Sequence, residues 1–157
     1  GFDFIICDSP AGIEKGAFLA MYFADRAIVV VNPEVSSVRD SDRVIGLLQS
    51  TTRRAENGER VEEHLLLTRY SPARVETGEM LSITDVEEVL GLKTIGVIPE
   101  SGDVLNASNK GEPVILSSES AAGQAYDDAV ARLLGQERPM RFTTTEKKGF
   151  LSKLCGG

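Results

Sequence analysis

The stretch Phe4-Ile5-Ile6-Cys7-Asp8-Ser9-Pro10-Ala11-Gly12 decides the predicted fold. Three apolar residues and a cysteine run into an acid, and a proline and a glycine follow. A short apolar run ended by turn residues is typical of a strand buried on both faces, as in a parallel sheet. Such a strand delivers Asp8 to the carboxyl edge of the sheet, where open α/β folds bind their ligands. The sequence therefore predicts an α/β protein with a functional edge at Asp8.

Asp8 and Gly12 are candidates for a phosphate site at this edge. A carboxylate there can hold a magnesium ion through its water shell. A glycine has no side chain, so its N–H can approach a phosphate oxygen closely. The alternative is a surface Asp8 that caps a helix beginning near Ile13.

The rest of the chain alternates predicted strands and helices. Residues 27–33 read as a β-branched, continuous strand stopped by proline. Helical spacing predicts a well-buried helix over residues 14–23, and Ser37 with Asp40 resembles a capping box for the next helix. The expected architecture is a mostly parallel sheet flanked by helices, with right-handed βαβ crossovers. Two further strands are predicted over residues 64–68 and 94–100. The helix that follows Ser37 is predicted to end near Gln49, and two more helices are predicted over residues 83–90 and 119–134.

Composition limits the class of protein. The 157 residues are enough for one domain with a core, and the net charge of −7 argues against general nucleic-acid binding. Cys7 and Cys155 lie at opposite ends of the chain, which is no disulfide framework and is compatible with a reducing cytosol. No apolar run in the sequence is long enough to span a bilayer.

The motif Asp8-Ser9-Pro10-Ala11-Gly12 after its apolar strand resembles the Walker-B and switch region of the MinD/ParA family of P-loop ATPases. The resemblance covers the whole chain in order and is nearest to the branch that selects the bacterial division site. The family's phosphate loop, G-x-x-x-x-G-K-[ST], does not occur in the sequence. The chain is therefore expected to be the carboxyl-terminal part of such an ATPase. Three further stretches carry the resemblance: Val30-Val31-Asn32-Pro33-Glu34-Val35-Ser36-Ser37-Val38-Arg39-Asp40, Leu65-Leu66-Leu67-Thr68-Arg69-Tyr70 and Glu146-Lys147-Lys148-Gly149-Phe150-Leu151.

The resemblance implies a set of nucleotide-binding residues for ATP and Mg²⁺. Asp8 would hold the magnesium water shell, and the backbone around Pro10, Ala11 and Gly12 would sense the γ-phosphate. Glu34 is a candidate for contacting nucleotide or the family's signature lysine across a dimer. The remaining candidates follow two later strands: Arg69, near a base-binding segment that often has Asn where Thr68 stands, and Pro99 with Glu100, which help form the base pocket.

The helix after residue 37 is the candidate partner surface. Asp40, Asp42 and Arg43 face outward in the predicted helix, and a mixed charged face is also what an ordinary solvated helix presents. In the resembled family this helix lies near the dimer interface and binds regulators. The implied partners are a second copy of the chain, a MinC-like division inhibitor and a MinE-like activator.

Residues 138–157 are predicted to form a tail beyond a domain of residues 1–137. If helical, the tail gathers apolar residues on one side with lysines flanking it, as in segments that lie on anionic membranes. A frayed terminus is the alternative. The membrane candidates are Lys148, Phe150, Leu151, Lys153 and Leu154.

Together these features predict a cytoplasmic ATPase that binds peripherally to the inner face of the cell membrane. ATP would drive dimerisation, membrane binding and recruitment of the inhibitor, and stimulated hydrolysis would cause release. One alternative is a ParA-like partition ATPase, against which the acidic balance and the amphipathic tail argue. The other is a non-catalytic membrane- and partner-binding module, because the phosphate loop is absent.

Overall fold

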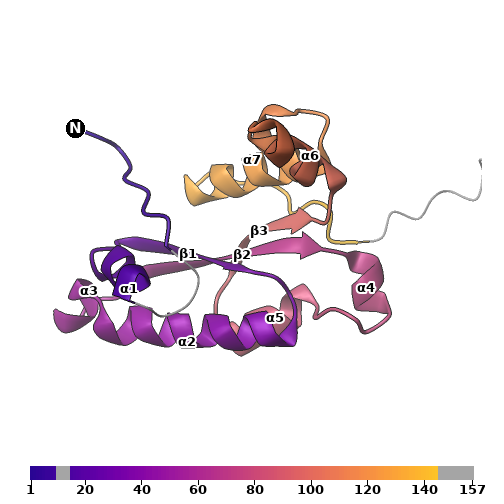
Figure 1. Ribbon diagram of the computed structural model, residues 1–157. Helices are drawn as coiled ribbons and strands as arrows, with labels where there is room; N and C mark the ends of the chain where they lie inside the picture. The colour runs from indigo at the N-terminus through magenta and orange to yellow at the C-terminus, as the bar shows by residue number, and fades with distance from the viewer. Residues whose placement is uncertain (10–14, 145–157) are drawn as a thin grey trace, which may run out of the picture.

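The computed structural model describes residues 1–9 and 15–144 (Figure 1). Its centre is a parallel sheet of three strands in the order β1-β2-β3. The strands are β1 (Arg26–Val31), β2 (Glu62–Tyr70) and β3 (Thr94–Pro99). The predicted α/β class with a parallel sheet flanked by helices is confirmed.

Helices cover both faces of this sheet (Figure 1). One face carries α2 (Val35–Thr51) and α5 (Ile83–Leu90), and the other carries α7 (Ala121–Leu133). None of the helices in the described residues is both long and apolar enough to cross a membrane. The shorter elements are α1 (Lys15–Tyr22), α3 (Arg53–Glu56), α4 (Pro72–Glu76), α6 (Gly102–Lys110) and the 3-10 turn η1 (Val114–Leu116).

Two packed clusters follow from the alternation of side chains along the strands. Toward α2 and α5, Leu65 and Leu67 of β2 are fully buried, and burial of each contributes about 1.5–3 kcal/mol. Toward α7, Leu66 and Ile98 pack against small residues of the helix. Gly96 permits this approach, because a Cβ at that position would lie 2.6 Å from the Cβ of Ala129. The alanines of α7 in this cluster are Ala122, Ala125 and Ala129.

The predicted buried strand before Asp8 is wrong for this structure. Residues 4–7 form no strand, and Ile6 is 92% exposed. A strand needs a neighbour for its backbone N–H and C=O groups, and β1 pairs only with β2 in the described sheet. The apolar residues before Asp8 therefore have no sheet partner.

The prediction that residues 14–23 form a well-buried helix is right about the helix and wrong about its burial. Ala17 is buried, whereas Leu19 and Phe23 are exposed. The strand that follows, β1, also has one face that no helix covers. Ile28 and Val30 lie on this face, on the α7 side of the sheet, and Val30 is 58% exposed. The apolar residues of this segment predicted burial, but the sequence could not tell whether anything packs against them.

The predicted capping box at Ser37 and Asp40 is also wrong. Helix α2 begins at Val35, after an extended Glu34 whose side chain makes no cap hydrogen bond. The Ser37 hydroxyl instead accepts a hydrogen bond from the backbone N–H of Asn32, at 3.3 Å. It thereby ties the start of α2 to the end of β1.

Candidate functional site

The carboxyl edge of the sheet brings together four of the predicted site residues. Glu34 follows β1, Arg69 lies near the end of β2, and Pro99 ends β3 with Glu100 next. Parallel strands end at the same edge, which is where open α/β sheets bind ligands. The predicted roles of these residues in nucleotide binding stay predictions.

Arg69 occupies an unusual backbone conformation at this edge. Its φ is +55°, in the left-handed region that disfavours residues with a Cβ. The pairing of β2 with β3 shifts register between Leu67 and Tyr70, so Arg69 lies in an irregularity of the ladder. The side chain is 71% exposed and points its Nη2 to within 4.0 Å of Oε1 of Glu100. Backbone strain of this kind is a feature of functional sites.

A second group of ion-paired side chains includes Glu34. Nη2 of Arg74 lies 3.8 Å from Oε1 of Glu34, and Nε of the same guanidinium lies 3.8 Å from Oε2 of Glu79. The backbone N–H of Leu81 donates to the carbonyl of Pro33 at 3.0 Å, so the segment after α4 is held against the turn that follows β1. Arg74 belongs to α4, a short helix that the sequence patterns above did not predict. Pro72 at the first turn of α4 is the sequence signal that could have indicated a helix there.

Asn32, which directly follows β1, is a further candidate residue at this edge. Its side-chain Oδ1 is buried and has no hydrogen-bond partner in the structure, although its backbone N–H and C=O are both paired. A buried acceptor without a partner requires a water molecule or a ligand group to satisfy it. Tyr70, the last residue of β2, is buried, and this burial raises the pKa of its hydroxyl above the ordinary value.

Asp8 is exposed and lies in a segment without regular structure. Pro10, Ala11 and Gly12, its predicted neighbours in the phosphate site, lie outside the described residues. Within residues 1–9 and 15–144, no three His, Cys, Asp or Glu side chains are grouped to hold a metal ion. The predicted role of Asp8, to hold a magnesium ion through its water shell, stays a prediction.

The candidate partner residues share the exposed face of α2. Val38, Ile45 and Leu48 are buried on the opposite face. Asp40, Asp42 and Arg43 are exposed, and Nη1 of Arg43 lies 3.6 Å from Oδ1 of Asp40. An exposed pair at this spacing contributes only a few tenths of a kcal/mol to stability. Both charges therefore stay available to a partner.

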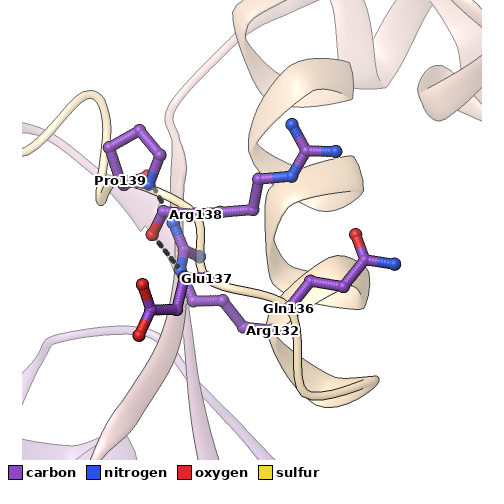
Figure 2. Close-up of a pocket in the computed structure, with 5 residues that line it drawn as sticks. All are labelled: Arg132, Gln136, Glu137, Arg138 and Pro139. Atoms are coloured by element: carbon purple, nitrogen blue, oxygen red, sulfur yellow. Dashed lines mark hydrogen bonds between the residues drawn. The ribbon is translucent and has the colours of Figure 1, made fainter.

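The hollow drawn in Figure 2 lies away from this edge. It encloses about 630 Å³ and is lined by Arg132, Gln136, Glu137, Arg138 and Pro139. Arg132 also donates to the carbonyl of Ile95, near the start of β3, so the hollow lies toward the opposite end of the sheet. The five membrane candidates between Lys148 and Leu154 lie outside the described residues.

Comparison with known proteins gives a consistent result. No protein-family model matches the chain. The septum site-determining protein MinD of Escherichia coli K12 is 65% identical over 157 residues, which is 99% of this chain and 58% of that protein. The chain thus spans a little over half the length of the curated relatives it matches.

Solved structures agree with this similarity. The MinD cell division protein of Aquifex aeolicus is 43% identical, with a TM-score of 0.80 over 89% of this chain and 56% of that chain. A MinC:MinD complex from the same organism is 42% identical, with a TM-score of 0.78 over 89% of this chain and 55% of that chain. The resemblance predicted from the motif at Asp8 is confirmed along the whole chain.

Proposed function

We propose that this chain is the carboxyl-terminal part of a MinD-type ATPase that acts in selection of the bacterial division site. The observation that carries the proposal is the similarity to MinD proteins over nearly every residue, in sequence and in fold. The carboxyl edge supports it, because Glu34, Arg69 and Glu100 gather where open α/β folds bind ligands.

The full-length protein would bind ATP and Mg²⁺ at this edge. Asp8 would hold the water shell of the metal, which neutralises phosphate charge when it is bound. Arg69 and Glu100 would border the base together with the backbone of Pro99, and Glu34 would face the nucleotide or a partner's lysine. Hydrolysis is proposed for the full-length protein and not for these 157 residues alone, because the sequence contains no phosphate loop.

ATP would join two copies and so control attachment to the inner face of the cell membrane. Burying three large apolar side chains of the tail gives on the order of 5 kcal/mol, and each lysine near an anionic surface adds about 1 kcal/mol. Ordering the segment consumes several kcal/mol of this gain. One tail would therefore bind weakly, whereas two tails on a dimer would bind far more tightly.

Regulators would act on the exposed face of α2. The solved MinC:MinD complex from Aquifex aeolicus supports a MinC-like inhibitor as one partner. Asp40, Asp42 and Arg43 would provide contacts for this inhibitor or for a MinE-like activator of hydrolysis. Their position supports this role, since α2 starts directly after Glu34 and leads away from the nucleotide edge.

Sedimentation of the full-length protein with anionic vesicles tests the proposal. We expect binding with ATP, little binding with ADP, and none after Phe150 and Leu151 are changed to Glu. Binding that ignores the nucleotide would reject the switch and leave the tail as a plain anchor. Absence of vesicle binding together with strong, salt-sensitive DNA binding would replace it with the ParA-like partition function.

A further inference from the structure

The chain turns back after α7 instead of leaving the domain. Arg132, in the last turn of α7, donates from Nε to the carbonyl of Arg138 at 3.0 Å and from Nη2 to the carbonyl of Pro139 (Figure 2). Its Nη1 donates to the carbonyl of Ile95 in β3 at 2.6 Å. One guanidinium thus joins the helix, the sheet and the segment of residues 136–142, which we call the strap.

A second arginine holds the strap further along. Arg141 donates from Nε to Oδ2 of Asp128 at 2.6 Å and from Nη1 to Oε1 of Gln124 at 2.8 Å. The Asp128 side chain is only 5% exposed, so this contact is a charge-assisted hydrogen bond in a mostly buried place. Asp128 and Gln124 lie one and two turns before Arg132 on α7. The strap therefore runs antiparallel to α7, back toward the start of that helix.

Phe142 ends the strap against the domain core. Its ring packs on the cluster formed by Leu66, Ile98 and the alanines of α7, and the Arg141 guanidinium lies 5.5 Å from the ring centre. Its φ is +61°, a conformation rare for a bulky residue. Ile98 is the residue before Pro99, so the strap reaches the carboxyl edge that holds Arg69 and Glu100. Such strain persists only where the surroundings hold the residue in place.

We propose that the strap fixes the point at which the carboxyl-terminal tail starts, next to the nucleotide edge, with Arg132 and Arg141 as its positioning residues. The membrane consequence rests on the function proposed above. With the strap in place, the last residue held against the domain before Phe150 is Phe142. Without the strap it is Leu134, at the end of α7, and the stretch of sequence up to Phe150 is about twice as long.

The length of chain between the domain and the membrane candidates sets how tightly a dimer binds a membrane through both of its tails. The effective concentration of a second tail falls with about the −3/2 power of tether length, so a doubled tether lowers it about threefold. The strap would thereby let a nucleotide-dependent dimer present both tails close to the edge at which it forms. Loss of the strap should weaken vesicle binding about threefold with ATP and leave nucleotide turnover in solution unchanged.

Chymotrypsin digestion of the full-length protein tests the strap itself. Cleavage after Phe142 reports an open strap, cleavage after Phe150 serves as the reference, and cleavage after Tyr126 within α7 reports unfolding of the domain. Arg141→Gln should raise cleavage after Phe142 at least about tenfold, because charge-assisted hydrogen bonds are lost. Arg138→Gln is the matched control, since it makes the same change in the same segment and should leave the rate unchanged.

Equal cleavage after Phe142 in the wild type and in Arg141→Gln would overturn the strap. If Arg141→Gln raises cleavage after Tyr126 and so unfolds the domain, Gln124→Ala replaces it, because that change removes the acceptor Oε1 and the Nε2 donor to the carbonyl of Ser118 but leaves the Arg141–Asp128 pair in place. The vesicle assay then compares Arg141→Gln with Arg138→Gln, which carry the same net charge. Equal vesicle affinity would overturn the coupling to the tail. Failure of the wild type to bind vesicles would reject the proposed function. Cleavage after Phe142 would still show whether Arg141 holds the strap against the domain.

Discussion

Nη2 of Arg69 and Oε1 of Glu100 lie 4.0 Å apart at the carboxyl edge of the sheet, and the backbone N–H of Glu100 donates to the carbonyl of Tyr70 at 2.9 Å. The two strand ends are thus joined both by backbone and by side chains. Arg69 holds this position with a left-handed backbone, at a φ of +55°. If the nucleotide binds at this edge, the pair lies where it would border the ligand.

The strain at Arg69 can be measured directly. Arg69→Gly and Arg69→Ala both remove the side chain, but only glycine accepts a φ of +55° without a steric penalty. We expect Arg69→Gly to be more stable than Arg69→Ala by about 0.5–1 kcal/mol in urea unfolding. An alanine variant as stable as the glycine variant would show that the backbone is relaxed at this position.

Glu34 should affect dimerisation of the full-length protein. Glu34→Gln removes the charge proposed to face the nucleotide, so ATP-dependent dimerisation should weaken about tenfold, as expected for a lost charged contact. Glu79→Gln is the control, because Glu79 pairs with the same guanidinium of Arg74. Sedimentation velocity with and without ATP measures the effect. The proposed role fails if both variants dimerise alike.

Asp8 should be needed for hydrolysis. Asp8→Ala in the full-length protein removes the carboxylate proposed to hold the water shell of magnesium, and ATP turnover should fall at least about tenfold. Asp3→Ala changes another exposed acid in the same segment and should have little effect. Phosphate release at saturating ATP and Mg²⁺ is the measurement. Unchanged turnover in Asp8→Ala would remove its assigned role.

Gly96 and Gly46 should respond in opposite directions to alanine. A Cβ at Gly96 would lie 2.6 Å from the Cβ of Ala129 and 2.7 Å from Cδ1 of Leu66, so α7 must move away from β3. Overpacking of this kind costs about 1–3 kcal/mol. A Cβ at Gly46 in α2 meets nothing within 4 Å, and Gly46→Ala should stabilise by about 0.5–1 kcal/mol. Denaturant unfolding compares the two, and a tolerated Gly96→Ala would contradict the close approach of helix and sheet.

The cap of α5 should make stability depend on acid pH. Ser82 donates from its hydroxyl to Oδ2 of Asp85 at 2.6 Å and from its backbone N–H at 3.0 Å, and these hydrogen bonds lower the pKa of Asp85. A folded-state pKa below the unfolded value adds stability above a pH of about 4, and this stability is lost as the pH falls through the folded-state pKa.

Ser82→Ala should therefore destabilise the protein at pH 7, and the difference from the wild type should shrink as the pH falls below about 4. Urea midpoints across this range measure the effect, and an NMR titration of Asp85 checks its cause. A difference that stays constant with pH would place the effect of Ser82 in its hydrogen bond to the backbone N–H of Asp85 alone.

Local signals in the sequence were enough for most elements. The β-branched run before Asn32 and the apolar run before Pro99 predicted parallel strands, because such runs are typical of strands buried between helices. Strand ends also predicted that Arg69 and Glu100 would share an edge, whereas Glu34 entered as a candidate through the family resemblance. The order of these motifs along the chain was specific enough to predict the resemblance to MinD proteins.

The sequence by itself thus determined the parallel α/β class, the edge that carries the candidate site and the family resemblance, since each depends on patterns within a few residues. Only the tertiary structure decided that Arg74 pairs with Glu34, that the residues before Asp8 form no strand, and that the strap returns along α7 and packs Phe142 against the core. The physical reason is that hydrogen bonds, ion pairs and burial depend on which groups distant in the chain come into contact. An apolar run forms a strand only beside another strand with free N–H and C=O groups. An arginine joins two segments only where acceptors from both lie within hydrogen-bond distance of its guanidinium.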